Sequence, residues 1–237
     1  MPWLRTVLNP PLRMLMRGVE WVGEITPGTR AADRFGAFGE ASCIGFPQAT
    51  MFGERSIHVG TRTLIGRHCT LSVGYGPSAE VLPARGLVIG DRCVIGTRTT
   101  LTAHESIEIG DDVWFGQGIF VSDASHGYQD PDEPIGDQLG AHLPVRIGSG
   151  SWIGHGAVIL PGTTIGRNVV VGAGSVVRGE IPDHAVVAGA PAKVIRRYEP
   201  GIGWIGRDAS DIRPIVTAND IERLAAEMAE ATSERTA

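Results

Sequence analysis

Aliphatic residues recur every six positions along much of this chain. From residue 147 the register runs through Ile147, Ile153, Ile159, Ile165, Val171 and Val177. Glycine follows most of these positions, and small or polar residues fill the rest. A period of six matches neither the α-helix nor the simple alternation of a single strand. It predicts short strands that each bury one aliphatic side chain and are separated by tight turns.

The same rule holds in three earlier blocks of the sequence. Their aliphatic positions are Val59, Ile65 and Leu71, then Ile89, Ile95 and Leu101, then Ile109, Phe115 and Val121. Three hexads make one triangular coil, and the strands of stacked coils pair in parallel. No coil can bury its own core, so stability comes from stacking. The pattern therefore predicts an all-β protein with a parallel β-helix of hexapeptide repeats over residues 41–197.

Interruptions of the register predict loops. At about 74–87, Pro77 and Pro83 stand where aliphatic residues are due, so we expect a loop there. A two-residue slip before Ile109 predicts a bulged corner. The longest interruption, at about 122–144, contains SDASHGYQDPDEPIGDQ, after which the register resumes. A long segment of this kind in a compact domain is usually functional, and we expect an arm folded back onto the surface.

The two ends of the chain contain no hexads. Residues 1–40 include an apolar and basic segment that predicts a short amphipathic helix. Its residues are Trp3, Leu4, Val7, Leu8, Leu12, Leu15 and Met16 with Arg5, Arg13 and Arg17. The segment either covers the open end of the β-helix or rests on a membrane surface through residues 1–24. Residues 198–237 form an extension in which we expect a helix over about 218–232, capped by Thr217 or Asn219.

Charge and cysteine content exclude several classes of function. A net charge of −5 argues against a general nucleic-acid-binding surface. Cys43, Cys69 and Cys93 are an odd number without a CxxC pair, which argues against a disulfide framework or a zinc knuckle. The sequence has no apolar run of about 18 residues, and its N-terminus lacks the features of a signal peptide. We therefore expect a cytoplasmic protein.

The segment WIGHGAVILPGTTIGRNVVVGAGSVVRGEIPDHAVVAGAPAKVI resembles the last coils of the hexapeptide-repeat acyltransferases. It is most similar to the branch of galactoside, maltose and xenobiotic acetyltransferases, and the resemblance covers about residues 57–197. It implies a left-handed β-helix, an O-acyltransferase that uses acetyl-CoA, and a homotrimer with active sites between subunits. The arm sequence HGYQDPDEPI resembles that of polysaccharide-associated acetyltransferases. A saccharide or glycoconjugate acceptor is therefore expected.

In this family the arm carries the catalytic histidine, and His126 matches it. Imidazole titrates near neutral pH and can accept the proton of a hydroxyl that attacks a thioester. Asp123 lies three residues earlier, and we expect it to bond one ring nitrogen of His126 and fix its tautomer. Simple solvation is the alternative role for this acid. Transfer is expected to be direct, because the arm contains no cysteine that could act as a nucleophile.

The resemblance also predicts the donor site. The positions that would contact coenzyme A are Trp152, His155, Ala173, Gly174, Arg178, Lys193 and Arg196. Small side chains at Ala173 and Gly174 would let a pantetheine arm lie along the prism. The basic residues suit the phosphates of the cofactor.

Tyr128, Arg98 and His104 are expected on the acceptor side. Gly96 stands where the galactoside branch often has an asparagine that helps to hold the sugar, so a different acceptor pocket is expected. Two other functions stay open. A zinc enzyme of the γ-carbonic-anhydrase kind needs three converging histidines, and the wide spacing of His104, His126 and His155 argues against it, so no metal site is predicted. A non-catalytic scaffold is the third alternative, against which the long arm argues.

Overall fold

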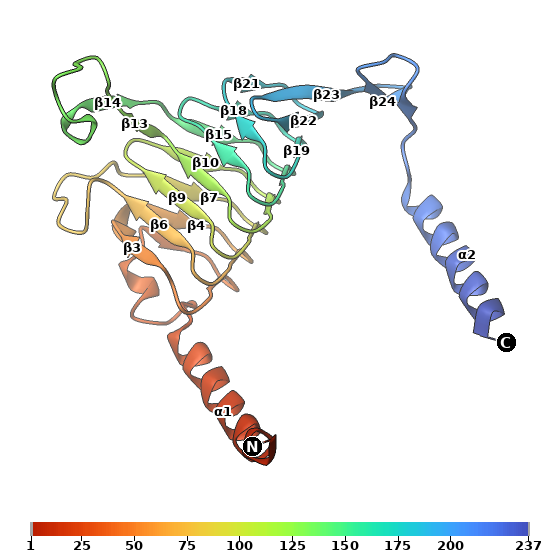
Figure 1. Ribbon diagram of the computed structural model, residues 1–237, viewed down its shortest axis with the longest axis horizontal. Coiled ribbons are helices and arrows are strands. Elements are labelled where there is room, and N and C mark those ends of the chain that lie inside the picture. Colours follow the sequence, from red (N-terminus) through yellow and green to blue (C-terminus); the bar gives the residue numbers. More distant parts are fainter. Residues whose placement is uncertain (1, 237) are drawn as a thin grey trace. The chain divides into compact units, whose positions relative to one another are not determined.

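The computed structural model describes the backbone of residues 2–236 and the side chains of residues 8–228. The chain divides into two compact units, residues 1–194 and residues 195–237. The first unit contains helix α1 (Pro2–Gly23) and a prism of short parallel strands (Figure 1). The second contains a small antiparallel sheet and helix α2 (Ala218–Thr236).

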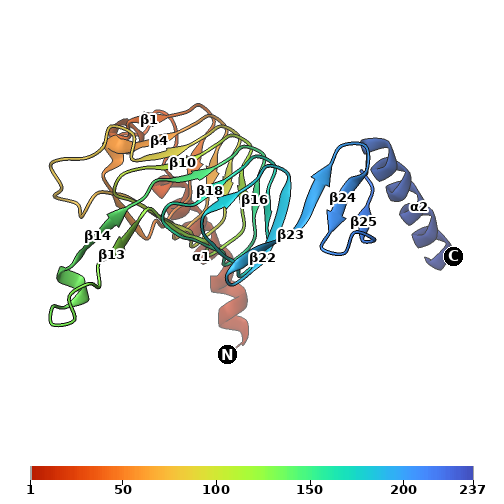
Figure 2. The ribbon, with the colours of Figure 1, turned by 90° about the horizontal axis from the view of Figure 1, so that it is seen from above.

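Three parallel sheets form the walls of the prism, and each coil adds one strand to each wall (Figure 2). The first wall consists of β1 (Ala37–Phe38), β4 (Ile57–Val59), β7 (Leu87–Ile89), β10 (Ile107–Ile109), β15 (Val145–Ile147), β18 (Thr164–Ile165) and β21 (Glu180–Ile181). The second wall consists of β2 (Cys43–Ile44), β5 (Leu64–Ile65), β8 (Val94–Ile95), β11 (Trp114–Phe115), β16 (Trp152–Ile153), β19 (Val170–Val171) and β22 (Ala185–Gly189). The third wall consists of β3 (Thr50–Phe52), β6 (Thr70–Val73), β9 (Thr100–Ala103), β12 (Phe120–Ser122), β17 (Val158–Ile159) and β20 (Val176–Val177).

The aliphatic positions of the hexads form the core of the prism. Ile89 pairs with Ile109 of the next coil, and Leu101 pairs with Val121, so like residues stack in columns. All four are almost completely buried. Burying one such side chain stabilises the fold by roughly 1.5–3 kcal/mol. The structure is thus mostly β, with the parallel sheets that the hexads predict.

Backbone segments approach one another very closely at the corner between the second and third walls. A Cβ atom at Gly96 would lie 2.0 Å from the carbonyl oxygen of Gly116 in the next coil. Real atoms do not approach so closely, so this position requires glycine for packing.

Helix α1 extends away from the β-helix instead of covering its first coil (Figure 1). Its last turn is held by Glu20, whose carboxylate accepts two hydrogen bonds from Arg67 at 2.7 and 2.9 Å. The described apolar side chains of the helix are exposed, among them Leu8, Leu12, Leu15, Met16, Val19 and Val22. They therefore do not pack as a cap on the β-helix of the same chain. The other predicted members of the segment, Trp3, Leu4, Arg5 and Val7, lie outside the described side chains.

Over the described residues, no helix has the length and apolar character needed to cross a bilayer.

Strand β23 (Ala192–Glu199) begins in the first unit and ends in the second. It pairs antiparallel with β24 (Gly203–Gly206), which pairs antiparallel with β25 (Ile212–Arg213). Helix α2 follows, and Thr217 precedes its first residue. The N–H of Asp220 donates to the Thr217 hydroxyl at 3.3 Å, and the N–H of Thr217 donates to the Asp220 carboxylate at 2.9 Å. This reciprocal pair satisfies donors that the start of a helix leaves unpaired. The sequence predicts the helix over about 218–232, and the structure has it over Ala218–Thr236.

Candidate active site

Three segments that interrupt the repeat leave from one corner of the prism. Strands β6, β9 and β12 pair in register in the third wall, with Val73 opposite Ala103 and Ser122 opposite Thr102. A loop (74–86), a turn (104–106) and the arm (123–144) follow these strands in that order. Because the strands are neighbours, the segments that follow them are neighbours as well. Residues far apart in the sequence therefore meet at this corner.

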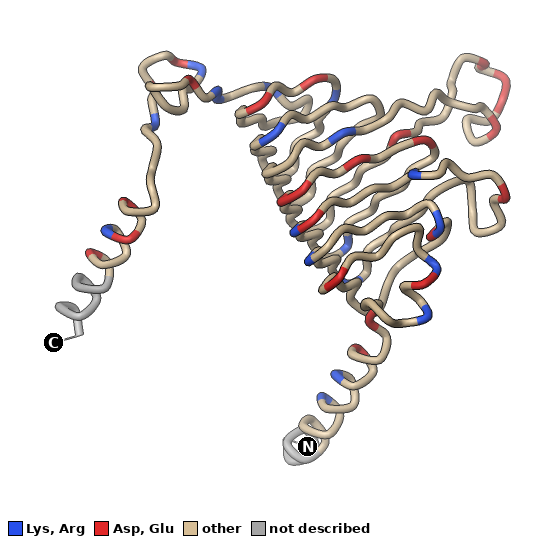
Figure 3. The backbone as a smooth tube through the Cα atoms, turned by 180° about the vertical axis from the view of Figure 1, so that it is seen from behind, with Lys and Arg blue, Asp and Glu red and all other residues tan. Residues whose placement is uncertain are grey.

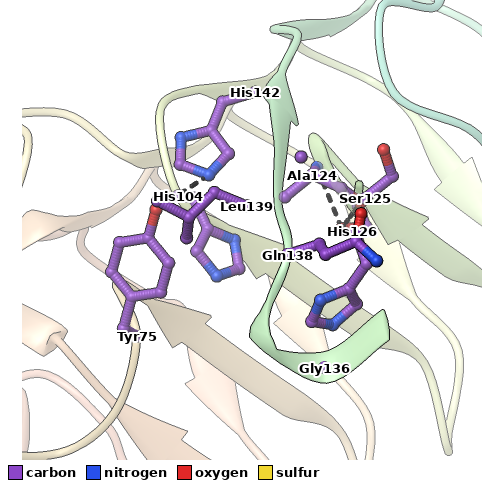
Figure 4. A pocket seen from close by; sticks show the side chains of 11 residues that line it. Tyr75, His104, Ala124, Ser125, His126, Gly136, Gln138, Leu139 and His142 are labelled. Carbon is purple, nitrogen blue, oxygen red and sulfur yellow. Dashed lines mark hydrogen bonds between the residues drawn. The ribbon is translucent and has the colours of Figure 1, made fainter. Parts of the chain in front are cut away.

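A cavity of about 290 Å³ lies where these segments meet (Figure 4), close to the ~300 Å³ at which small-molecule sites begin. We call it the arm cavity. Its lining residues include Tyr75, His104, Ser125, His126, Leu139 and His142. The structure thus brings the predicted base, His126, to one site with His104 from the predicted acceptor group.

The arm itself is an ordered hairpin. Strand β13 (Ala124–His126) pairs antiparallel with β14 (Leu139–His142), so that His126 lies opposite Leu139. A short 3-10 turn, η3 (Ile135–Asp137), closes the tip. The amide of Gln138 donates to the carbonyl oxygens of Asp130 and Glu133 at 2.8 and 3.0 Å. These bonds fix the two Pro-containing turns and hold His126 on a defined strand.

Asp123 is fully buried at the base of the arm. Its carboxylate accepts hydrogen bonds from the backbone N–H groups of His104, Glu105 and Ser106 at 2.8, 2.8 and 2.7 Å. Its Oδ1 also lies 3.7 Å from Nδ1 of His104. Among the described residues, no hydrogen bond joins Asp123 to His126. The expected pairing of Asp123 with His126 is therefore not observed, and Asp123 lies beside His104 instead. The reason is that the backbone N–H groups of the bulged corner converge on this carboxylate.

His104 is largely buried, with 18% of its side chain exposed. Burial lowers its pKa, the Asp123 carboxylate opposes this effect, and His142 and His126 lower the pKa further. Nδ1 of His104 is buried and has no hydrogen-bond partner among the described residues. The nearby carboxylate favours a proton on Nδ1, which leaves Nε2 as a hydrogen-bond acceptor.

Two lining residues, Tyr75 and His142, were missed by sequence reasoning. The Tyr75 hydroxyl and Nε2 of His142 are hydrogen-bonded at 2.9 Å. The ring of His104 lies 4.8 Å from the Tyr75 ring and 5.2 Å from the His142 ring, centroid to centroid (Figure 4). Neither residue belongs to a motif. The sequence could have indicated them in one way: Tyr75 and His142 each lie near an end of a long interruption of the repeat, and interruptions at the same corner of the prism lie side by side.

The predicted donor residues lie mainly at a different corner. Trp152 is exposed on the second wall, where it pairs with Trp114. His155, Ala173 and Gly174 follow the second wall in consecutive coils, and the Gly174 N–H donates to the His155 carbonyl at 2.8 Å. The arm leaves after the third wall, so within one chain these residues are not brought to the arm cavity.

The remaining predicted residues are dispersed. Arg98 is exposed at the corner between the second and third walls, and Tyr128 is exposed on the arm without lining the cavity. Arg178 is exposed after β20, at the last coil. Lys193 lies on β23, and in the second unit Arg196 forms an ion pair with Asp211. The structure of one chain therefore gathers only His126 and His104, with Asp123 behind them.

Cys69 and Cys93 are buried at the small position of the hexad, and burial raises the pKa of both thiols. Such thiols are poor nucleophiles. Within the described part of the chain, no three or more His, Cys, Asp or Glu side chains are grouped to hold a metal ion.

Two family models match the coils. The model described as "Bacterial transferase hexapeptide (six repeats)" matches residues 144–179, and "Hexapeptide repeat of succinyl-transferase" matches residues 86–123. A solved structure of a variant of AntD, an N-acyltransferase from Bacillus cereus, in complex with dTDP-4-amino-4,6-dideoxyglucose and coenzyme A, superposes with a TM-score of 0.62. It is 20% identical and covers 88% of this chain and 98% of that chain, which shows a shared fold.

Two curated relatives are more similar in sequence. "Probable acetyltransferase Rv3034c" of Mycobacterium tuberculosis is 35% identical over 169 residues, which are 71% of this chain and 51% of the relative. This chain thus spans about half the length of that protein. "Putative lipopolysaccharide biosynthesis O-acetyl transferase WbbJ" of Escherichia coli is 37% identical over 141 residues, which are 56% of this chain and 70% of the relative. With the hexapeptide coils and these relatives, the chain belongs to the hexapeptide-repeat acyltransferases.

Proposed function

We propose that this protein transfers an acetyl or other short acyl group from coenzyme A to a hydroxyl of a saccharide or glycoconjugate. The observation that carries the proposal is the arm cavity, into which a β-helix of the acyltransferase family delivers His126. The names of the relatives, which include an O-acetyl transferase of lipopolysaccharide biosynthesis, support an oxygen acceptor. The coenzyme A and amino sugar bound by AntD support the donor and the saccharide class.

His126 acts as the general base in this proposal. Its imidazole takes the proton of the acceptor hydroxyl as the oxygen attacks the thioester carbonyl. The new C–O bond forms, the C–S bond breaks, and the proton returns from the imidazole to the departing thiolate. Transfer is direct, because the buried thiols of Cys69 and Cys93 offer no nucleophile.

The donor would lie along the corner between the second and third walls, against Trp152, His155, Ala173 and Gly174. Arg178 and Lys193 would face its phosphates, whereas Arg196 would first have to leave Asp211. Trp152, His155, Ala173 and Gly174 belong to the second wall and the corner after it, away from the arm cavity of the same chain. We therefore propose a homotrimer of left-handed β-helices in which a neighbouring subunit completes each site. An exposed, in-register apolar row on the second wall supports this assembly; it includes Leu64, Trp114 and Trp152.

We also propose that α1 rests on a membrane surface, at the cytoplasmic face. Its described apolar side chains are exposed, and the helix also carries the positive charges of Arg13 and Arg17 (Figure 3). Glu20 is neutralised by Arg67, so it opposes an anionic surface only weakly. Three free cysteines fit a reducing compartment. In vesicle flotation, wild-type protein should float with anionic lipid, and a variant with Leu12→Glu and Leu15→Glu should remain in solution; equal flotation of both would contradict this placement.

The assignment of the base is tested by His126→Gln. Thiol release from acetyl-CoA with a competent saccharide should fall by roughly 10²–10⁴-fold, while coenzyme A binding by calorimetry is kept. His68→Gln is the matched control, since His68 is an exposed histidine outside the arm cavity. Turnover near the wild-type level in His126→Gln would remove the base assignment. A wild-type protein that binds no coenzyme A would favour a non-catalytic scaffold.

A further inference from the structure

One side of the arm cavity is formed by Tyr75, His104 and His142, which we call the ring cluster (Figure 4). The three rings come from the 74–86 loop, the 104–106 turn and strand β14. Although the Tyr75 hydroxyl is hydrogen-bonded to His142, 71% of Tyr75 is exposed. An exposed aromatic side chain with an anchored polar tip presents a rigid face that is apolar at its centre and polar at its edge.

The hydrogen-bonding groups of the ring cluster can both donate and accept. Asp123 favours the proton on Nδ1 of His104, so Nε2 of that ring accepts. The bond to Tyr75 uses Nε2 of His142, which leaves Nδ1 for another partner. The Tyr75 hydroxyl can exchange its donor and acceptor roles with His142. Sugar hydroxyls, which also donate and accept, match such a set.

The charge of this corner selects against anions. Neither lysine nor arginine is among the residues of this chain that line the cavity. The buried Asp123 carboxylate lies directly behind His104. Burial lowers the pKa of His104, which favours the neutral form of this ring. A phosphate bound here would lose water without gaining a cation from the lining residues of this chain, which is costly.

We propose that the ring cluster is the acceptor subsite and that it takes an uncharged sugar ring. Hydroxyls of the sugar bond Tyr75, His104 and His142, and one further hydroxyl faces His126. Any phosphate or lipid carrier of the acceptor then lies outside the cavity. This inference rests on the proposed function, since it names the acceptor of the same reaction.

The test compares paired acceptors with acetyl-CoA as the donor and thiol release as the signal. The panel contains the methyl glycosides of galactose, glucose, mannose and N-acetylglucosamine, and the 1-phosphates of the same sugars. At least one methyl glycoside should be acetylated, with kcat/KM at least about tenfold above that of its 1-phosphate, which corresponds to about 1.4 kcal/mol. Preference for the sugar phosphates would overturn the proposal.

Two variants separate acceptor binding from folding and from the donor. Tyr75→Phe keeps the ring and removes the hydroxyl, and His142→Gln removes its partner. Each should raise the acceptor KM by roughly 2- to 10-fold, the value of one hydrogen bond, with the KM for acetyl-CoA unchanged; His68→Gln should change neither. An unchanged acceptor KM, or a change confined to acetyl-CoA, would overturn the subsite.

The outcomes also distinguish the two proposals. If the wild-type protein binds acetyl-CoA but acetylates no methyl glycoside of the panel, the subsite proposal fails and the donor assignment stands. If it binds no acetyl-CoA, the proposed function fails as well.

Discussion

The buried carboxylate of Asp123 offers the sharpest test of how the acceptor corner is built. Its Oδ2 accepts the N–H groups of Glu105 and Ser106 at 2.8 and 2.7 Å, and its Oδ1 accepts that of His104 at 2.8 Å. Asp123→Asn preserves the shape but leaves one oxygen. If that oxygen keeps the bonds to Glu105 and Ser106, the new NH₂ group faces the N–H of His104, so two donors meet in a buried site. The His104 N–H then has only its longer contact to Oδ2, at 3.1 Å.

The magnitude follows from this geometry. One hydrogen bond to a charged group is lost, which costs about 1.5–3 kcal/mol, and a buried donor is left unpaired. In a protein of this size each kcal/mol lowers the melting temperature by about 2–4 °C. The free energy of unfolding should therefore fall by about 1.5–3 kcal/mol and the melting temperature by about 3–12 °C.

Calorimetry of Asp123→Asn should be paired with calorimetry of Asp111→Asn. Asp111 also accepts a backbone hydrogen bond, from Asp91 at 2.8 Å, but 51% of its side chain is exposed. Water can replace that bond, so the control should change stability by less than about 1 kcal/mol. The acceptor KM of Asp123→Asn should rise while coenzyme A binding is kept. Equal melting temperatures for the two variants would refute the role given to this carboxylate.

Three further predictions address the core, the titration and the assembly. Ile153→Ala, at a fully buried position, should lower the free energy of unfolding by about 2–5 kcal/mol in urea titrations. Because the pKa of His104 is lowered in the folded protein, the unfolded state binds more protons when the pH falls below about 6.5. The stability that the neutral His104 contributes is therefore present above about pH 6.5 and is lost as the pH falls through that value. His104→Gln should reduce the loss of melting temperature between about pH 7.5 and 5.5. Trp114→Glu, in the apolar row of the second wall, should shift the mass measured by light scattering from trimer to monomer, and an unchanged mass would contradict the proposed interface.

The walls of the prism were predictable because each hexad places one aliphatic residue in the core. Ile89 and Leu101 obey the six-residue rule and are buried. The first coil, β1–β3, was not recognised as hexads. Its core-facing partners include Ile44 and Met51, opposite Ile65 and Leu71, and the step between them is one residue longer than a hexad. A single extra residue at a corner breaks the six-residue period of the sequence, although the strands of this coil still pair in register with those of the next coil.

The partners within the site were less predictable for a related reason. In a β-helix the spatial neighbours of a residue lie one coil away in sequence. Asp123 therefore bonds His104, 19 residues earlier, and not His126. Tyr75 and His142 are separated by 67 residues because two interruptions lie between them. The spacing of a motif can suggest that an Asp and a His three residues apart form a pair. Which residues lie at the same corner follows only from the pairing register of neighbouring coils.

The placement of the interruptions also separates the two halves of the proposed reaction. Insertions at the corner after the third wall leave the parallel pairing intact, since β10 pairs with β15 directly across the arm and β4 pairs with β7 directly across the 74–86 loop. At the corner between the second and third walls the coils lie close together, as Gly96 and Gly116 do, and among the described residues no long segment interrupts them there. This regular corner suits a ligand that is constant, the acyl donor of the proposed reaction. The corner after the third wall accepts inserted segments, so it suits the acceptor, the ligand that the protein must select. His126 and the ring cluster lie at this corner.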